Sequence, residues 1–163
     1  MGIDQTRLED AVDHVEITRL EAAYADIVTR RRFDEFVEVM LADVVVDLDL
    51  RDRHLIHDGP KAIGDFIADA FEEFEFFQFV VLGVRTALRV DGDADRANAR
   101  VYMSELRQTH SGHWSQVYGI YHDQLRRIDD RWWIAARTYH SLARNNMPAQ
   151  LFEFPHHLDL ETF

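Results

Sequence analysis

The second half of the sequence contains three long runs of strand-forming residues that are separated by very short turns. The runs cover residues 96–109, 114–128 and 132–142, with turn residues at Ser111-Gly112 and Asp129-Asp130. Strands joined by such short turns are antiparallel neighbours, because a parallel connection needs a dozen or more residues. The sequence therefore predicts a meander of long antiparallel strands.

The first half of the chain shows helical periodicity instead. Apolar residues recur at helical spacing from Leu8 to Arg30 and again, more briefly, from Phe33 to Leu41. Alternation over Val44–Leu50 predicts a half-buried strand, and Pro60 suits the first position of a third helix. A phenylalanine-rich segment then leads into a strand that runs to Val90. This order predicts an α+β fold, a cone in which three helices pack on a curved, mostly antiparallel sheet around one pocket.

The chain of 163 residues has the length of one domain, and it shows no repeat, low-complexity segment or linker. Residues 145–163 lack a regular pattern but contain Phe152, Phe154 and Phe163. We therefore expect a single domain over residues 1–163, with 145–163 as a tail that packs on its body.

Charge and cysteine content narrow the possible partners. The net charge of −12 disfavours nucleic acid and anionic membrane surfaces, since both would repel the chain. The absence of cysteine removes disulfides, thiolate nucleophiles and iron–sulfur clusters, and it fits a reducing compartment. No signal-peptide pattern and no apolar run of about 20 residues is present, so we expect a cytoplasmic protein.

The usual cofactor motifs are also missing. The chain has only 7 glycines and no glycine-rich phosphate loop, so a nucleotide cofactor is not expected. It has no Gly-x-Ser-x-Gly elbow and neither His-x-His nor His-Glu-x-x-His. We expect neither a metal nor any other cofactor.

Two stretches resemble the SnoaL-like branch of the NTF2-like superfamily. The first is Tyr24-Ala25-Asp26 with the segments 31–36 and 43–46 after it, and the second is Gly119-x-Tyr121-x-Asp123 continuing to Trp132-x-Ile134. The resemblance spans roughly residues 8–143 and implies a cone around one pocket. Its members include scytalone dehydratase, bile-acid 7α-dehydratases, hexachlorocyclohexane dehydrochlorinase, polyketide cyclases and, more distantly, ketosteroid isomerase and the small subunits of ring-hydroxylating dioxygenases. Because this fold hosts many chemistries, the resemblance specifies the fold better than the reaction.

The resemblance implies that the family's usual acid–base pair is absent. Tyr24 matches the tyrosine that faces the pocket in the dehydratases, but Thr29 stands where those enzymes have an aspartate. The histidine partner of that aspartate falls near Phe79–Val81, where the chain has no histidine. Leu48 occupies the position of the base of ketosteroid isomerase.

Two other carboxylates are candidate acids or bases. Glu105 matches an acidic residue of the bile-acid dehydratases, and Asp123 lies close to the position of the isomerase's oxyanion-hole acid. Strand alternation places Asp123 on one face with Tyr121, so the family register would point both into the cone. A carboxylate facing an apolar cavity can move a proton near neutral pH. We therefore predict Glu105, Asp123 and Tyr24 as catalytic residues, with Tyr24 and Tyr121 orienting the substrate.

Other interpretations of these residues remain open. Asp123 could instead form a structural ion pair with Arg137 or Arg107, and Tyr24 could be a plain core aromatic residue. The predicted substrate-binding residues share an expected position at the cavity wall or mouth. They are Tyr121, Thr29, Val101, Met103, His57 and Leu48.

The sequence favours a cofactor-independent lyase, isomerase or cyclase that acts on a small, largely apolar or aromatic ring compound. One alternative is a non-catalytic binding or structural module of the same fold. Another is a small subunit that resembles those of aromatic-ring dioxygenases. The resemblance also implies a homo-oligomer, a dimer or a trimer.

Overall fold

The computed structural model describes residues 4–145 and 149–151. Helix α1 (Gln5–Thr29) and the 3-10 helix η1 (Phe33–Glu38) precede strands β1 (Met40–Asp49) and β2 (His54–Asp58). Helix α2 (Pro60–Phe71), strand β3 (Phe74–Leu88) and the short 3-10 helix η2 (Val90–Gly92) follow. The chain continues with β4 (Arg96–Thr109), β5 (Trp114–Ile128), β6 (Arg131–Asn145) and β7 (Ala149–Leu151).

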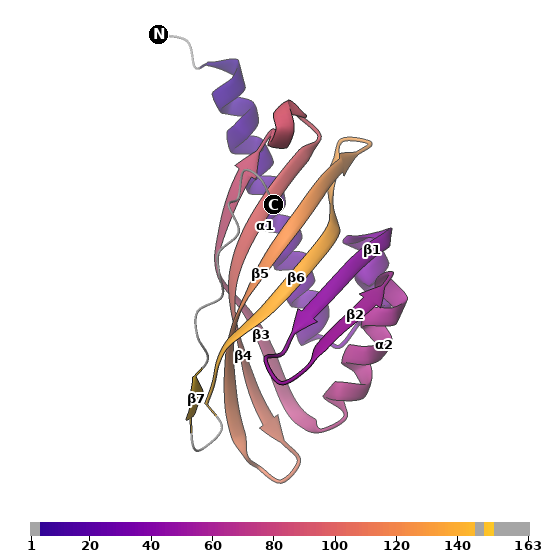
Figure 1. The fold of residues 1–163 in the computed structure, drawn as a ribbon, viewed down its shortest axis with the longest axis vertical. Coiled ribbons are helices and arrows are strands. Elements are labelled where there is room, and N and C mark those ends of the chain that lie inside the picture. The colour runs from indigo at the N-terminus through magenta and orange to yellow at the C-terminus, as the bar shows by residue number, and fades with distance from the viewer. Residues whose placement is uncertain (1–3, 146–148, 152–163) are drawn as a thin grey trace.

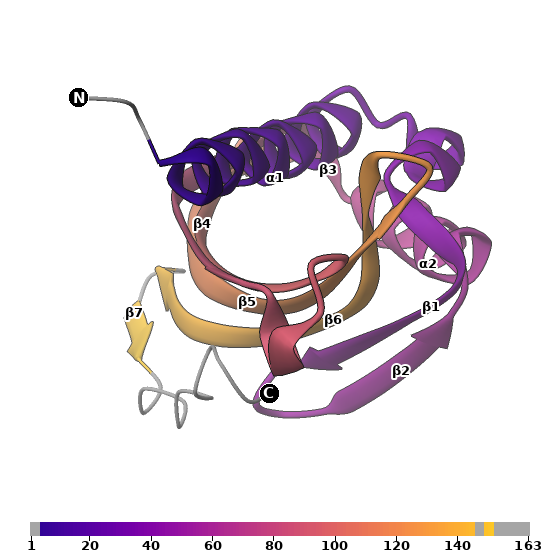
Figure 2. The same cartoon turned by 90° about the horizontal axis from the view of Figure 1, so that it is seen from above.

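The strands form one sheet in the order β2-β1-β6-β5-β4-β3, and β7 pairs with β6. All pairings are antiparallel except β1 with β6, which is parallel. The sheet curves strongly, and α1 lies across the open side of the curve (Figures 1 and 2). The predicted α+β cone is therefore confirmed. Within the described residues, no helix is long and apolar enough to cross a membrane.

Helix α1 begins at a polar cap, since the Asp4 side chain accepts a hydrogen bond from the backbone N–H of Thr6. Its second half carries the buried face, with Ile17, Leu20 and Tyr24 against the sheet. The first half extends beyond the sheet (Figure 1), which leaves Val12 and Leu8 about half exposed despite their helical spacing. Helical periodicity therefore predicted where the helix lies, but it did not predict that only the second half of the helix is buried.

Three predicted elements need correction. The segment Phe33–Leu41 is not one α-helix, because η1 ends at Glu38 and Met40 already pairs with Ile134 of β6. The segment that carries His54 and His57 was not predicted as a strand, but it forms β2 at the edge of the sheet. Strand β6 runs to Asn145, three residues past the predicted end.

Helix α2 begins at Pro60, as predicted, after Gly59 at φ +85°. Gly64 lets this helix approach η1 closely, because a Cβ atom there would lie 3.0 Å from the backbone oxygen of Phe33. Strand β5 has the predicted bounds. The tail residues Phe152, Phe154 and Phe163 lie outside the described residues, so their predicted packing stays a prediction.

Candidate functional site

A cavity of about 430 Å³ lies on the concave side of the sheet, between β1, α2 and the ends of β4, β5 and β6. This volume is within the range of roughly 300–1,000 Å³ that is usual for small-molecule sites. Apolar residues and polar residues both contribute to its wall. The apolar lining residues are Val46, Leu48, Leu50, Ile63, Phe66, Ile67, Ala70, Phe71, Phe74 and Val117.

Three tyrosines line this cavity. Tyr24 comes from α1, Tyr121 from β5 and Tyr139 from β6. The ring centroids of Tyr24 and Tyr121 are 6.0 Å apart, and those of Tyr121 and Tyr139 are 5.3 Å apart. Burial raises the pKa of all three phenols. At neutral pH the three side chains are therefore hydrogen-bond donors rather than phenolates.

Gly119 makes room for one of these rings. It is two residues before Tyr121 on β5, and a Cβ atom at this position would lie 2.3 Å from Cε2 of Tyr139 and 2.9 Å from Sδ of Met103. No other residue type fits there unless Tyr139 moves. The glycine at the start of the Gly119-x-Tyr121 motif is therefore a sequence signal for the cavity, although its partner could not be named from the sequence.

Glu105 lies in the cavity wall beside Arg107, two residues along β4. The Arg107 guanidinium donates hydrogen bonds to the Glu105 carboxylate and also lies 5.3 Å from the ring centroid of Phe74. The Glu105 side chain is 14% exposed to solvent, and the Arg107 side chain is 26% exposed. A carboxylate, a guanidinium and the three phenols thus converge on one largely apolar cavity.

Asp123 lies on the same face of β5 as Tyr121 but does not line the cavity. Both of its oxygens accept hydrogen bonds from Arg137, at 2.8 and 2.6 Å, which confirms the alternative interpretation of this residue as an ion-pair partner. Arg137 also donates to Glu21 of α1 at 2.5 Å. All three side chains are almost completely buried.

The two cavity tyrosines cover this charged cluster. The Arg137 guanidinium lies 4.2 Å from the ring centroid of Tyr24 and 4.2 Å from that of Tyr121. Cation–π contacts of this kind strengthen when they are desolvated. The cluster of Arg137, Asp123 and Glu21 therefore fixes the positions of the two rings that form part of the cavity wall.

Glu21 is a residue that sequence reasoning missed. Burial raises its pKa from 4.5 to about 8, against the opposing effect of Arg137, while Asp123 adds to the rise. The side chain is thus mostly protonated at neutral pH, and the cluster holds one positive and one negative charge. Its position one helical turn before Tyr24 was the only available signal.

Thr29 and Phe79 lie side by side, as the family resemblance implies for the positions of the acid–base pair. The hydroxyl oxygen of Thr29 accepts a hydrogen bond of 3.0 Å from the backbone N–H of Phe79. Neither side chain can move a proton as an aspartate or histidine would. Thr29 does not line the cavity in the described structure, and its hydroxyl is used to tie α1 to β3.

The remaining predicted binding residues divide into two groups. Leu48 lines the cavity. Val101 and Met103 do not line the cavity. Both are completely buried and belong to the hydrophobic core. His57 lies on β2 with its ring centroid 4.5 Å from that of Phe66, so it contacts a lining residue from outside.

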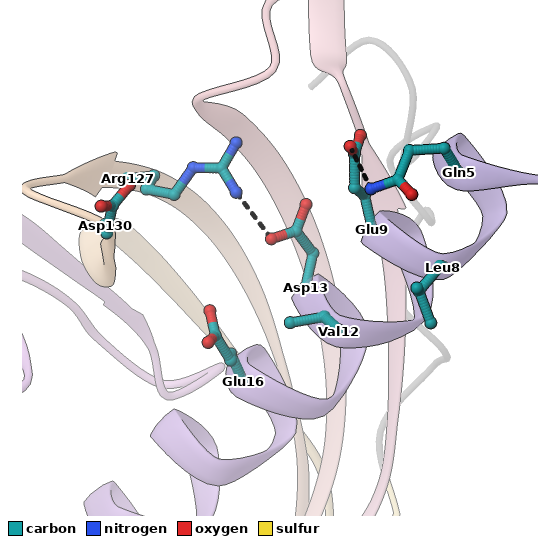
Figure 3. Close-up of a pocket in the computed structure, with 8 residues that line it drawn as sticks. All are labelled: Gln5, Leu8, Glu9, Val12, Asp13, Glu16, Arg127 and Asp130. Atoms are coloured by element: carbon teal, nitrogen blue, oxygen red, sulfur yellow. Dashed lines mark hydrogen bonds and ion pairs between the residues drawn. The ribbon is translucent and has the colours of Figure 1, made fainter.

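A second hollow, of about 290 Å³, lies at the other end of the molecule along the first turns of α1 (Figure 3). Here Arg127 binds Asp13 at 2.7 Å, and Asp13 also accepts a hydrogen bond from the indole of Trp132. Arg127 reaches Asp95 at 2.9 Å as well. These contacts attach α1 to the ends of β5 and β6, so we assign them a structural role.

A curved sheet, a helix across its open side and a tyrosine-lined cavity on its concave face define the class of α+β cone proteins. The chain belongs to the SnoaL-like domain family, whose model matches residues 9–138. This match confirms the resemblance seen in the two sequence stretches. No curated protein matches the chain.

Solved structures with the same fold come from several proteins. A candidate scytalone dehydratase from Novosphingobium aromaticivorans has a TM-score of 0.74 and 14% identity, with 94% of each chain covered. The hexachlorocyclohexane dehydrochlorinase LinA-type3 from Novosphingobium barchaimii has a TM-score of 0.72 and 14% identity, with 94% of this chain and 99% of that chain covered. The Kfla4162 protein from Kribbella flavida has a TM-score of 0.73 and 19% identity, with 84% and 95% covered. At these identities the likeness shows the fold alone.

Proposed function

We propose that this protein is a cofactor-independent lyase or isomerase that acts on a small, largely apolar ring compound in the cavity. The observation that carries the proposal is the convergence of the Glu105 carboxylate and three protonated tyrosines on a cavity that is also lined by ten apolar residues. Dehydratases and dehydrochlorinases among proteins of the same fold support this reaction class.

Glu105 is the proton-transfer residue in this proposal. Its carboxylate would accept a proton from a carbon next to a carbonyl or leaving group, and the Arg107 guanidinium beside it holds the carboxylate in place. In an isomerase the same carboxyl group would return the proton to another carbon. In a lyase the electrons of the broken C–H bond would form the new double bond as the leaving group departs.

The tyrosines stabilise the negative charge that develops on the substrate. Tyr24, Tyr121 and Tyr139 are O–H donors, and donors placed in a dry site before the reaction stabilise a developing enolate strongly. Asp123 takes a different role from the one predicted from the sequence. It holds Arg137, and Arg137 holds Tyr24 and Tyr121, so we assign Asp123 as a positioning residue.

A second candidate function is non-catalytic binding of the same class of compound. It is favoured by Thr29 and Phe79 at the positions of the family's acid–base pair and by the pairing of Glu105 with Arg107. In that case the cavity would bind a ring compound and leave its carbon-bound hydrogens unchanged.

Solvent-exchange NMR separates the two candidates before the substrate is known. The protein is incubated in D₂O with a panel of cyclic and aromatic ketones, and deuterium entry next to the carbonyl is followed by proton NMR. We expect exchange with at least one bound ketone, and its loss in Glu105→Gln. Glu75→Gln, which changes an exposed acid on β3, is the control. Binding without exchange would support the non-catalytic candidate and contradict the enzyme.

A further inference from the structure

Among the charged lining residues that the proposed function does not use, arginines outnumber acids. Arg53 lies in the connection between β1 and β2, and Arg144 lies near the end of β6. Glu73, between α2 and β3, is the one acid besides Glu105 among the described lining residues. Two arginines against one glutamate is an unusual balance for a chain with a net charge of −12.

The backbone holds the two arginines against the same residue. Arg144 donates a hydrogen bond of 2.8 Å to the carbonyl oxygen of Leu50. The backbone N–H of Leu50 in turn donates to the carbonyl oxygen of Arg53 at 3.0 Å. Leu50 itself lines the cavity, as do Arg53 and Arg144, so the backbone of Arg53 and the guanidinium of Arg144 meet at one section of the cavity wall.

The neighbouring arginines are engaged in ion pairs. Arg107 is paired with Glu105, and Arg51 is paired with Asp49 at 3.1 Å. Arg53 makes no ion pair within residues 4–145, and its side chain is exposed. An exposed guanidinium beside an apolar cavity is a ready partner for a carboxylate, which it can bind through two parallel hydrogen bonds.

We propose that the rim formed by Arg53 and Arg144 is an anion subsite, and that the ligand of the cavity is an apolar ring compound with one carboxylate group. Glu73 on the same rim favours a single negative charge over a dianion, because it would repel the second charge. This inference shares the cavity with the proposed function, but it concerns binding and does not depend on Glu105.

The test compares two probes that differ only in charge. Binding of 2-naphthoate and of its neutral methyl ester to the full chain is measured by isothermal titration calorimetry at low ionic strength. We expect the acid to bind about tenfold more tightly than the ester, the effect of one charge-assisted hydrogen bond at a partly exposed site. The difference should shrink at high salt.

Three variants locate the subsite. Arg53→Gln and Arg144→Gln should each weaken 2-naphthoate binding several-fold and leave the ester unchanged, whereas Glu73→Gln should tighten 2-naphthoate. Arg51→Gln, in the same connection but outside the cavity lining, is the matched control. Circular dichroism checks folding, and Arg53 and Glu73 test the proposal even if the loss of Arg144 disturbs β6.

Equal binding of acid and ester, or the same loss for both probes in Arg53→Gln, would overturn the anion subsite and leave the proposed function intact. Failure of both probes to bind would contradict the subsite and also the assignment of the cavity to ring compounds. Tight binding of the acid without deuterium exchange of any ketone would support the subsite and contradict the enzyme.

Discussion

Two carboxylate–arginine clusters lie on the concave face of the sheet, and water reaches only one of them. Arg137 with Asp123 and Glu21 is closed off between α1 and the strands, with side-chain exposures of 0–1%. Arg107 with Glu105 lines the cavity and stays partly exposed. The same pairing of residue types therefore serves two purposes.

The difference follows from what lies on the other side of each pair. Helix α1 covers Arg137 and supplies Glu21 and Tyr24, so the buried cation is surrounded by protein groups. No helix covers Arg107 in the same way, and its flat face rests on Phe74 and Phe77. The Glu105 carboxylate is therefore accessible from the cavity, whereas the Asp123 carboxylate lies behind two tyrosines.

Removal of the arginine should lower the free energy of unfolding much more in one cluster than in the other. The loss at Arg137 is the largest effect that we expect. Arg137→Met leaves Asp123 buried without its partner, so we expect the free energy of unfolding to fall by about 3–5 kcal/mol. Arg107→Met removes a partly exposed pair and should cost no more than about 1 kcal/mol. Urea unfolding followed by circular dichroism measures both. Equal losses in the free energy of unfolding would mean that water reaches both clusters to the same extent.

The pH dependence of stability sharpens the same comparison at Glu21. Its folded-state pKa is raised to about 8 from 4.5, so the folded protein holds a proton that the unfolded chain releases. Stability from this group is fully present below pH 4.5 and is lost as the pH rises through about 8. We expect this loss to amount to a few kcal/mol.

Glu21→Gln should remove this part of the pH dependence, because glutamine stays neutral. Glu16→Gln on the same helix is the control and should keep it. Thermal unfolding between pH 5 and 9 provides the measurement. A difference between the wild-type and Glu21→Gln curves that stays flat over this range would show that Glu21 is ionised in the folded protein.

A substitution on the cavity side should have a modest effect on stability and a large one on binding. Gly119→Ala places a methyl group against Tyr139 and Met103, and overpacking of this kind costs about 1–3 kcal/mol. Because Tyr139 lines the cavity, a displaced ring should change the shape of the cavity and weaken the binding of a ring compound. Gly83→Ala on β3 is the matched control, since a Cβ atom there meets nothing within 4 Å. Unchanged binding in Gly119→Ala would place the ligand away from Tyr139.

The sequence located most of the elements but not all of their ends. The bounds of β5 and the start of α2 were predictable because turn residues and Pro60 mark them locally. The start of β1 was not, since Met40 joins the sheet through its parallel partner Ile134, almost a hundred residues away. Strand β2 was missed for a similar reason, as its short segment gains its structure from pairing with β1.

For the site, the sequence by itself determined the fold family, the inward face of the strands and the residues Tyr24, Tyr121, Leu48 and Glu105, which do line the cavity. Alternation along a strand and motif spacing are local properties, and a single sequence displays them. Only the tertiary structure decided that Asp123 binds Arg137, that Glu21 joins them and that Gly119 accommodates Tyr139. These contacts join residues on different elements, and which carboxylate is solvated and which is enclosed depends on how α1 packs across the sheet.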